Sequence, residues 1–293
     1  MIKVKDPGRM AVMIIHGIGQ QHADFAQEFQ CRLERRLRKQ LKRMGVPAAL
    51  FPFEFYPVHW APILEELSDE LIQRLHLEKL AWRDLRKFVV SYLGDAIAYQ
   101  RPAVRREFVY DLIHQRLKAK LREAARTCGE SAPLCIIAHS LGTIIAHEFI
   151  KDLQQGGMQL KIRRTPLEQG RTLALYFTTG SPLPIWSLRE QGYGTPPEVP
   201  SPELRQRFLG SVGGWWNFYS KYDVLSYPLR QINAEYGAVV TRDVRVATGG
   251  WLSRWTPLSH NGYWTDSRVI RRMAREMLNV WSRCAGLPAG GKR

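Results

Sequence analysis

The sequence predicts an α/β fold with a mostly parallel central sheet and helices on both of its faces. Short apolar runs, amphipathic stretches between them, and a serine motif between an apolar run and a helical stretch all point to this class. Short apolar runs are typical of strands buried on both faces, and strands that alternate with helices form parallel sheets. We expect one domain, residues 1–293.

The first part of the chain shows this alternation. Apolar runs predict buried strands over Met10–Ile15 and Leu134–His139. Between them, apolar residues at a spacing of four predict a helix over 22–44, and 50–56 predicts a second strand. Residues 57–100 are rich in leucine, tryptophan and charge and are longer than a crossover needs. We expect this insertion to form a helical cap or lid.

The second part continues in the same way. Helices are expected at 101–126, 141–155 and 266–283, and strands at 172–178, 216–220 and 239–246. The stretch 182–202 is rich in proline and predicts an irregular surface loop.

The formal net charge of +16 is the unusual bulk property. Its basic residues gather in a few stretches, at 32–43, 101–106, 116–126, 161–164 and 268–275. Such a surface attracts anionic lipid, acidic substrates or nucleic acid; the alternative is a solvated basic face. Because no nucleic-acid-binding motif accompanies the charge, we expect no nucleic-acid partner and favour peripheral contact with an anionic membrane.

Cysteine use and the first residues bear on the cellular compartment. The four cysteines have no CxxC spacing, which argues against a zinc site or a disulfide framework. Residues 1–10 are polar and lack the pattern of a signal peptide. The apolar runs are too short to cross a bilayer. We expect a cytoplasmic protein, with or without peripheral membrane contact.

The decisive motif is Ala138-His139-Ser140-Leu141-Gly142, between an apolar strand and a helix. This is the context of a nucleophile elbow, a strained turn that exposes a reactive serine. The residues two before and two after the serine must be small, and here they are alanine and glycine. The alternative is an ordinary serine cap of a helix. Ser140 is the candidate nucleophile, and the Leu141 amide at the helix N-terminus is a candidate oxyanion donor.

A second motif, His16-Gly17-Ile18-Gly19, follows the first predicted strand. Its glycines let the backbone approach a ligand closely. The alternatives are a plain glycine-rich turn or a phosphate loop, for which the remaining motif residues are missing.

An activated serine needs a histidine base and a carboxylate that orients it. In elbow enzymes these follow the serine in the order acid, then histidine. His260 is the only histidine after His147, which is expected on a helix face. The side chain of His139 is expected to project away from the site.

The acid must therefore lie between Ser140 and His260. Asp223 is the candidate because it lies in a loop just after a predicted strand, where parallel sheets place functional groups. Asp243 is the backup, although it falls inside a predicted strand. The alternative interpretation of either carboxylate is a solvated surface charge.

Together these motifs resemble the α/β-hydrolase superfamily, and its serine esterases and lipases in particular, over residues 10–283. The segments around Asp223 and from His260 to Trp264 are similar to those of intracellular lipase-like members. The resemblance implies that the amide of Ile18 is the other oxyanion donor. The sequence departs from the family pattern at Ala138, which replaces a glycine, and at the insertion 57–100.

The resemblance implies hydrolysis of small-molecule or lipid esters through an acyl-enzyme, without a metal or an organic cofactor. The same triad serves thioesterases, amidases and acyltransferases, so these remain alternatives. A further alternative is a non-catalytic protein that binds partners through its basic surface on a hydrolase fold.

Overall fold

A six-stranded, all-parallel sheet forms the centre of the protein. The computed structural model describes residues 8–18, 22–76, 94, 99, 109–155, 165–207, 213–248 and 257–287. The strands lie in the order β2-β1-β3-β4-β5-β6. Their bounds are β1 (Met10–Ile15), β2 (Phe53–Val58), β3 (Leu134–His139), β4 (Leu173–Thr179), β5 (Gly214–Tyr219) and β6 (Val240–Arg245).

The parallel register brings the carboxyl ends of the strands to one edge. Ile15 of β1 pairs with Val58 of β2 and with Ala138 of β3, and His139 pairs with Thr179 of β4. β1, β3 and β4 are buried along their whole length, as expected for strands covered on both faces. The predicted fold class is therefore confirmed.

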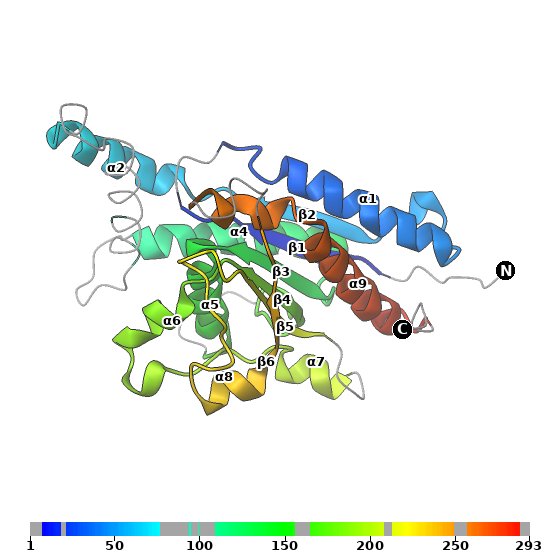
Figure 1. Cartoon of the computed structure of the whole chain (residues 1–293). Helices are drawn as coiled ribbons and strands as arrows, with labels where there is room; N and C mark the ends of the chain where they lie inside the picture. The colour runs from blue at the N-terminus through cyan, green and yellow to red at the C-terminus, as the bar shows by residue number, and fades with distance from the viewer. Residues whose placement is uncertain are drawn as a thin grey trace.

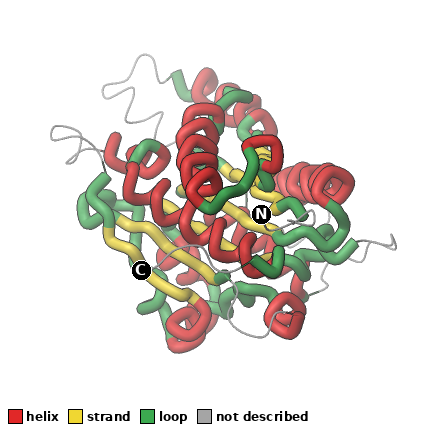
Figure 2. Tube along the Cα trace, turned by 90° about the vertical axis from the view of Figure 1, so that its right-hand side faces the viewer, coloured by secondary structure: helices red, strands yellow, loops and turns green. Residues whose placement is uncertain are grey.

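Helices cover the two faces of the sheet (Figures 1 and 2). α1 (Gln27–Arg43) and α9 (Ser267–Cys284) pack side by side on one face, and α4 (Val109–Cys128) and α5 (Leu141–Gln154) cover the other. Each strand residue faces one layer or the other in turn: Ala11 and Met13 join the α4 and α5 core, whereas Met10 and Val12 join the α1 and α9 core.

The helices form where the apolar spacing predicts them. The four buried residues of α1 are Phe29, Leu33, Leu37 and Leu41, which recur at every fourth position. α9 starts at an N-cap aspartate, Asp266, whose carboxylate accepts the amides of Arg268 and Val269. None of the described helices is long and apolar enough to cross a membrane.

Several boundaries differ from those predicted. β2 starts at Phe53 rather than at residue 50, because residues 48–50 form a 3-10 turn after Pro47. α1 starts at Gln27, since the preceding residues form turns. The expected loop 182–202 instead contains α6 (Leu183–Trp186) and two 3-10 turns.

The sequence did not predict α7 (Pro202–Arg207) and α8 (Ala234–Val239), two short helices beside the sheet. In the insertion 57–100, α2 (Pro62–Arg74) is helical as expected. Residues 77–93, 95–98 and 100 lie outside the described residues, so the cap stays a prediction.

Candidate active site

Ser140 stands at the turn from β3 into α5. Its backbone has φ 52° and ψ −128°, a left-handed conformation that is strained for a residue with a side chain. The turn is held on both sides: the Ser140 amide donates to the carbonyl of Thr179 at 3.0 Å, and the Thr143 amide donates to the Ser140 carbonyl at 2.9 Å. This is the geometry of a nucleophile elbow.

The small residues of the motif have visible reasons. A Cβ atom added at Gly142 would collide with the main chain of Ile15 and His16 at the end of β1. Ala138 is fully buried, and it pairs with Ile15 on one side and with Thr178 on the other. Alanine therefore fits this position.

His260 reaches the serine from the last loop of the chain. It lies in a 3-10 segment, η6 (Pro257–Trp264), directly before α9. Its Nε2 atom lies 2.7 Å from Ser140 Oγ, and its Nδ1 atom lies 2.8 Å from Asp223 Oδ2. Because a carboxylate only accepts hydrogen bonds, the proton sits on Nδ1. Nε2 is then free of its proton and can accept the serine hydroxyl.

Asp223 lies in the loop after β5 and is buried. Its Oδ1 accepts the amide of Leu225 at 3.1 Å, and its Oδ2 accepts both His260 and the hydroxyl of Tyr263 at 2.9 Å. Burial alone would raise the pKa of Asp223, but the hydrogen bond and charge of His260, with the Leu225 amide and Tyr263, lower it below its usual value. The group is therefore a carboxylate at neutral pH.

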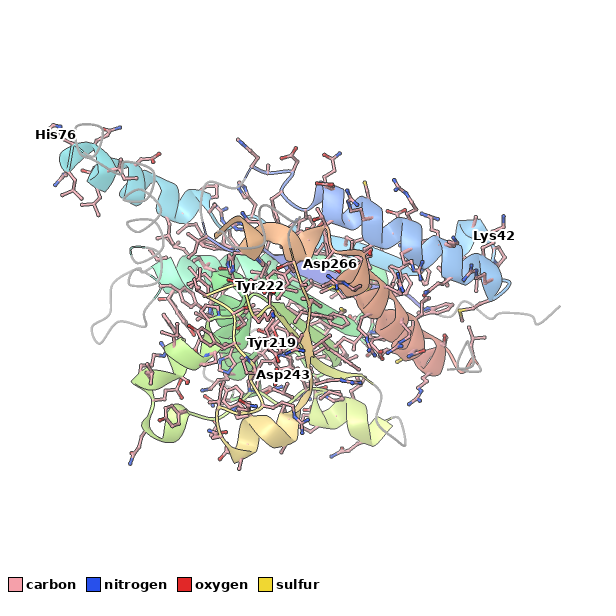
Figure 3. All side chains as sticks on the ribbon, in the orientation of Figure 1. Lys42, His76, Tyr219, Tyr222, Asp243 and Asp266 are labelled. Carbon is pink, nitrogen blue, oxygen red and sulfur yellow. The ribbon has the colours of Figure 1, made fainter. Side chains whose placement is uncertain are left out.

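The structure thus brings together the three predicted side chains, Ser140, His260 and Asp223. It does not bring the backup acid to them. Asp243 accepts the side-chain amide of Asn217 at 2.7 Å and the main-chain amides of Leu229 and Arg230. It ties the edge strand β6 to the segment after β5, and Figure 3 labels it below Tyr219.

The loop after β1 comes close to Ser140. A Cβ atom added at Gly17 would lie 2.6 Å from Ser140 Cβ, so the backbone before Ile18 passes directly beside the serine. Ile18 packs its side chain against the core shared with α5, and Leu141 is the first residue of α5. The two predicted donors thus lie on segments that border Ser140.

His16 anchors this loop, a role that the sequence reasoning missed. Its Nδ1 lies 2.7 Å from the Gly17 carbonyl, and its Nε2 accepts the Trp60 amide at 3.1 Å. The indole N–H of Trp60 donates a hydrogen bond of 2.9 Å to the His16 carbonyl, and the two rings stack. Burial lowers the pKa of His16 to about 3, although the bond to Gly17 raises it, so this histidine is neutral.

Two other buried histidines, His139 and His147, lie close to Ser140 in the sequence. His147 lies on α5, as expected, where its Nε2 is 2.8 Å from the Tyr236 hydroxyl. His139 was expected to project away from the site, but its side chain contacts it: its Nε2 lies 2.8 Å from the carbonyl of His260, and the two ring centroids are 4.8 Å apart. No local pattern signals this contact, because it joins positions 121 residues apart.

Tyr263 was also missed as a site residue. Its hydroxyl contacts both Asp223 and Ser226, and its side chain is 1% exposed. The one available signal was its place three positions after His260, in the segment that resembles lipase-like members.

The fold is that of the α/β hydrolases. This assignment stands on the parallel sheet and on the strand–turn–helix around Ser140. No family model matches the sequence, and a search of curated proteins finds no match.

Two solved structures resemble the chain at low identity. A fungal esterase from Rhizomucor miehei is 13% identical, with a TM-score of 0.44, over 96% of this chain and 78% of that chain. Phospholipase PlaB from Legionella pneumophila is 12% identical, with a TM-score of 0.33, over 73% of this chain and 40% of that chain.

Proposed function

We propose that this protein is a serine hydrolase that cleaves carboxylic esters through an acyl-enzyme. One observation carries the proposal: the Ser140 hydroxyl lies 2.7 Å from His260, whose other ring nitrogen lies 2.8 Å from a buried carboxylate. A strained turn and a continuous relay to a buried acid are the features of an activated serine. A helix-capping serine has no need of either.

The chemistry follows from these contacts. His260 Nε2 takes the proton of Ser140 Oγ as the oxygen attacks the ester carbonyl, and the amides of Ile18 and Leu141 receive the developing oxyanion. His260 then gives the proton to the departing alcohol, which leaves the acyl group on Ser140. In the second half, His260 takes a proton from a water molecule as the water oxygen bonds to the acyl carbon. The bond from that carbon to Ser140 Oγ then breaks, and His260 returns the proton to the serine.

Asp223 has an electrostatic task in this cycle. His260 becomes a cation each time it takes a proton, and the carboxylate 2.8 Å from Nδ1 stabilises that cation while fixing the tautomer. The lowered pKa of Asp223 keeps the charge in place over the whole neutral range. Lipid esters are the proposed substrates, on the resemblance to lipase-like members.

The basic helices support a peripheral membrane contact as part of the proposal. α1 holds seven basic and two acidic residues, and α9 holds five and one. These two helices therefore carry +9 of the chain's net charge of +16. They lie side by side, with Lys42 near the end of α1 and Asp266 at the start of α9 (Figures 1 and 3). A surface of this charge attracts anionic lipid.

Labelling by a fluorophosphonate probe tests the proposed activity. Wild-type protein is compared with Ser140→Ala, and p-nitrophenyl esters of short and long acyl chains are assayed in parallel. The proposal expects labelling and ester cleavage that both disappear in the variant. A folded wild-type protein that takes no label would refute it and favour a binding protein. Faster cleavage of matched amides or thioesters would reassign the reaction to that class.

Flotation with vesicles tests the membrane contact separately. The protein should float with phosphatidylserine-containing vesicles at low salt and not with purely zwitterionic ones, and binding should fall as salt rises. Absence of binding to anionic vesicles at low salt would end this part of the proposal.

A further inference from the structure

The side chain directly before the nucleophile makes a contact that the triad chemistry does not use. His139 is the last residue of β3 and is 4% exposed. Its Nε2 lies 2.8 Å from the main-chain carbonyl of His260. A carbonyl oxygen only accepts hydrogen bonds, so Nε2 carries the proton and donates it. The imidazole is thus the Nε2–H tautomer.

The ring of His139 is enclosed by the segment that carries His260. The ring centroids of the two histidines are 4.8 Å apart, and the indole of Trp264 meets His139 edge-on at 5.5 Å. Trp264 packs in turn against Phe29 of α1 at 4.7 Å. The ring is therefore buried and packed against the same segment whose carbonyl it holds.

The opposite edge of the ring faces the loop after β1. A Cβ atom added at Gly17 would lie 3.1 Å from Nδ1 of His139. His139 consequently fills the space between the proposed oxyanion loop and the His260 segment, and its own main chain leads into Ser140. One side chain contacts or adjoins three separate parts of the site.

We propose that His139 is a positioning residue. By donating a hydrogen bond to the carbonyl of His260, it fixes the main-chain position from which the ring of His260 reaches both Ser140 and Asp223. This inference rests on the proposed function. His260 makes hydrogen bonds at both ring nitrogens, at 2.7 and 2.8 Å. Both bonds are kept only if the Cα atom of His260 stays within a fraction of an ångström of its present position. The donor belongs to the rigid end of a central strand, whereas His260 belongs to a short 3-10 segment.

The role requires a neutral donor, and the surroundings supply one. Burial first, and then the nearby charge of His260, lower the pKa of His139 to about 3, although its bond to the His260 carbonyl and the charge of Asp223 raise it. A second cation here would oppose the positive charge that His260 acquires during turnover. His139 is thus suited to hold the base without competing for its proton.

Two substitutions separate the hydrogen bond from the volume of the ring. Glutamine places an amide N–H the same number of bonds from Cα as Nε2, so His139→Gln keeps a neutral donor. Leucine has similar bulk without a donor, so His139→Leu removes the bond. His147→Leu is the matched control, because His147 is equally buried and hydrogen-bonded but contacts Tyr236 instead of the triad.

The experiment measures kcat and KM for a p-nitrophenyl ester and the stability of each variant by urea unfolding. His139→Leu should lower kcat about 30- to 100-fold, as expected when a supporting hydrogen bond is lost and a reacting group moves by up to an ångström. KM should change less than about threefold, and His139→Gln should recover most of kcat. His147→Leu should lose stability but keep kcat.

Two results would overturn the inference: His139→Leu with wild-type kcat, or His139→Gln as impaired as His139→Leu. A readout without turnover separates this inference from the proposed function. The proton between His260 Nδ1 and Asp223 gives a low-field NMR signal, which should persist in His139→Gln and vanish or shift in His139→Leu. An inactive wild-type protein would refute the ester hydrolase, and an unchanged signal in His139→Leu would still refute the positioning role.

Discussion

Adding one methyl group at Gly17 should damage the candidate site without touching any of its reactive atoms. The Cβ of Gly17→Ala would lie 2.6 Å from Ser140 Cβ, 3.1 Å from His139 Nδ1 and 3.2 Å from the His139 carbonyl oxygen. Ordinary contacts between such atoms begin near 3.4 Å. These neighbours belong to the strand end and the strained elbow, so none of them moves easily. Either the loop before Ile18 or Ser140 must shift by close to 1 Å.

A shift of that size sets the expected magnitude. Displacing a reacting group by about 1 Å costs roughly 100-fold in rate, and overpacking a buried site costs about 1–3 kcal/mol of stability. We expect kcat/KM for a p-nitrophenyl ester to fall about 100-fold, with a loss of about 1–3 kcal/mol in the free energy of unfolding.

The matched control is Gly237→Ala, in α8. There the added Cβ meets one main-chain oxygen, that of Arg230, at 3.2 Å, so activity should stay near that of the wild type. A Gly17→Ala protein with wild-type kcat/KM would refute the reasoning, because it would mean that the loop after β1 yields freely and does not define the site.

Three other predictions concern the groups around the triad. Asp223→Asn should lower kcat by about 10³- to 10⁴-fold with the fold intact, because an amide can donate to His260 and favour the wrong tautomer; a loss below tenfold would exclude Asp223 as the orienting acid. Tyr263→Phe removes a donor to Asp223 Oδ2 and should lower kcat about tenfold, with about 1–3 kcal/mol of lost stability, and unchanged kinetics would contradict it. Burial lowers the pKa of His16 and of His139 to about 3, below about 6.5 in the unfolded chain. The contribution of the two neutral histidines to the free energy of unfolding is therefore complete above pH 6.5. It declines as pH falls, by about 2 kcal/mol per histidine at pH 5. Urea unfolding from pH 7 to pH 5 should show this loss of stability, and the part due to His139 should be absent in His139→Gln. An identical loss in the variant would contradict the lowered pKa of His139.

The elements best predicted from sequence are those whose burial is complete. β1 and β3 match their predicted bounds because their residues are apolar throughout, apart from His139, where β3 ends at a turn. The sharp turn at Ser140 was predictable for a related reason: its constraint is local, since a Cβ atom at Gly142 would collide with the main chain of β1. The order of serine, acid and histidine then left Asp223 and His260 as the natural partners.

What the sequence could not predict depends on contacts between distant segments. Nothing near His139 signals its bond to a carbonyl 121 residues away. Tyr263 appeared as part of a motif, but its partner is a carboxylate in another loop. The start of β2 was misjudged because apolar residues 50–52 continue the strand pattern, whereas the 3-10 turn over Ala48–Leu50 delays pairing until Phe53.

Gly180 shows how the sheet, rather than any single loop, assembles the site. Ser140 follows β3 and Asp223 follows β5, so the end of β4 lies between them, and the ring that joins them must cross it. Gly180 comes directly after β4 with φ +60°, and a Cβ atom there would lie 3.0 Å from Cε1 of His260 and 3.1 Å from the ring of Tyr263. Its sequence context indicated only the end of a strand. In the fold, glycine at this position both permits the left-handed turn and leaves the space in which the imidazole reaches from the carboxylate to the serine.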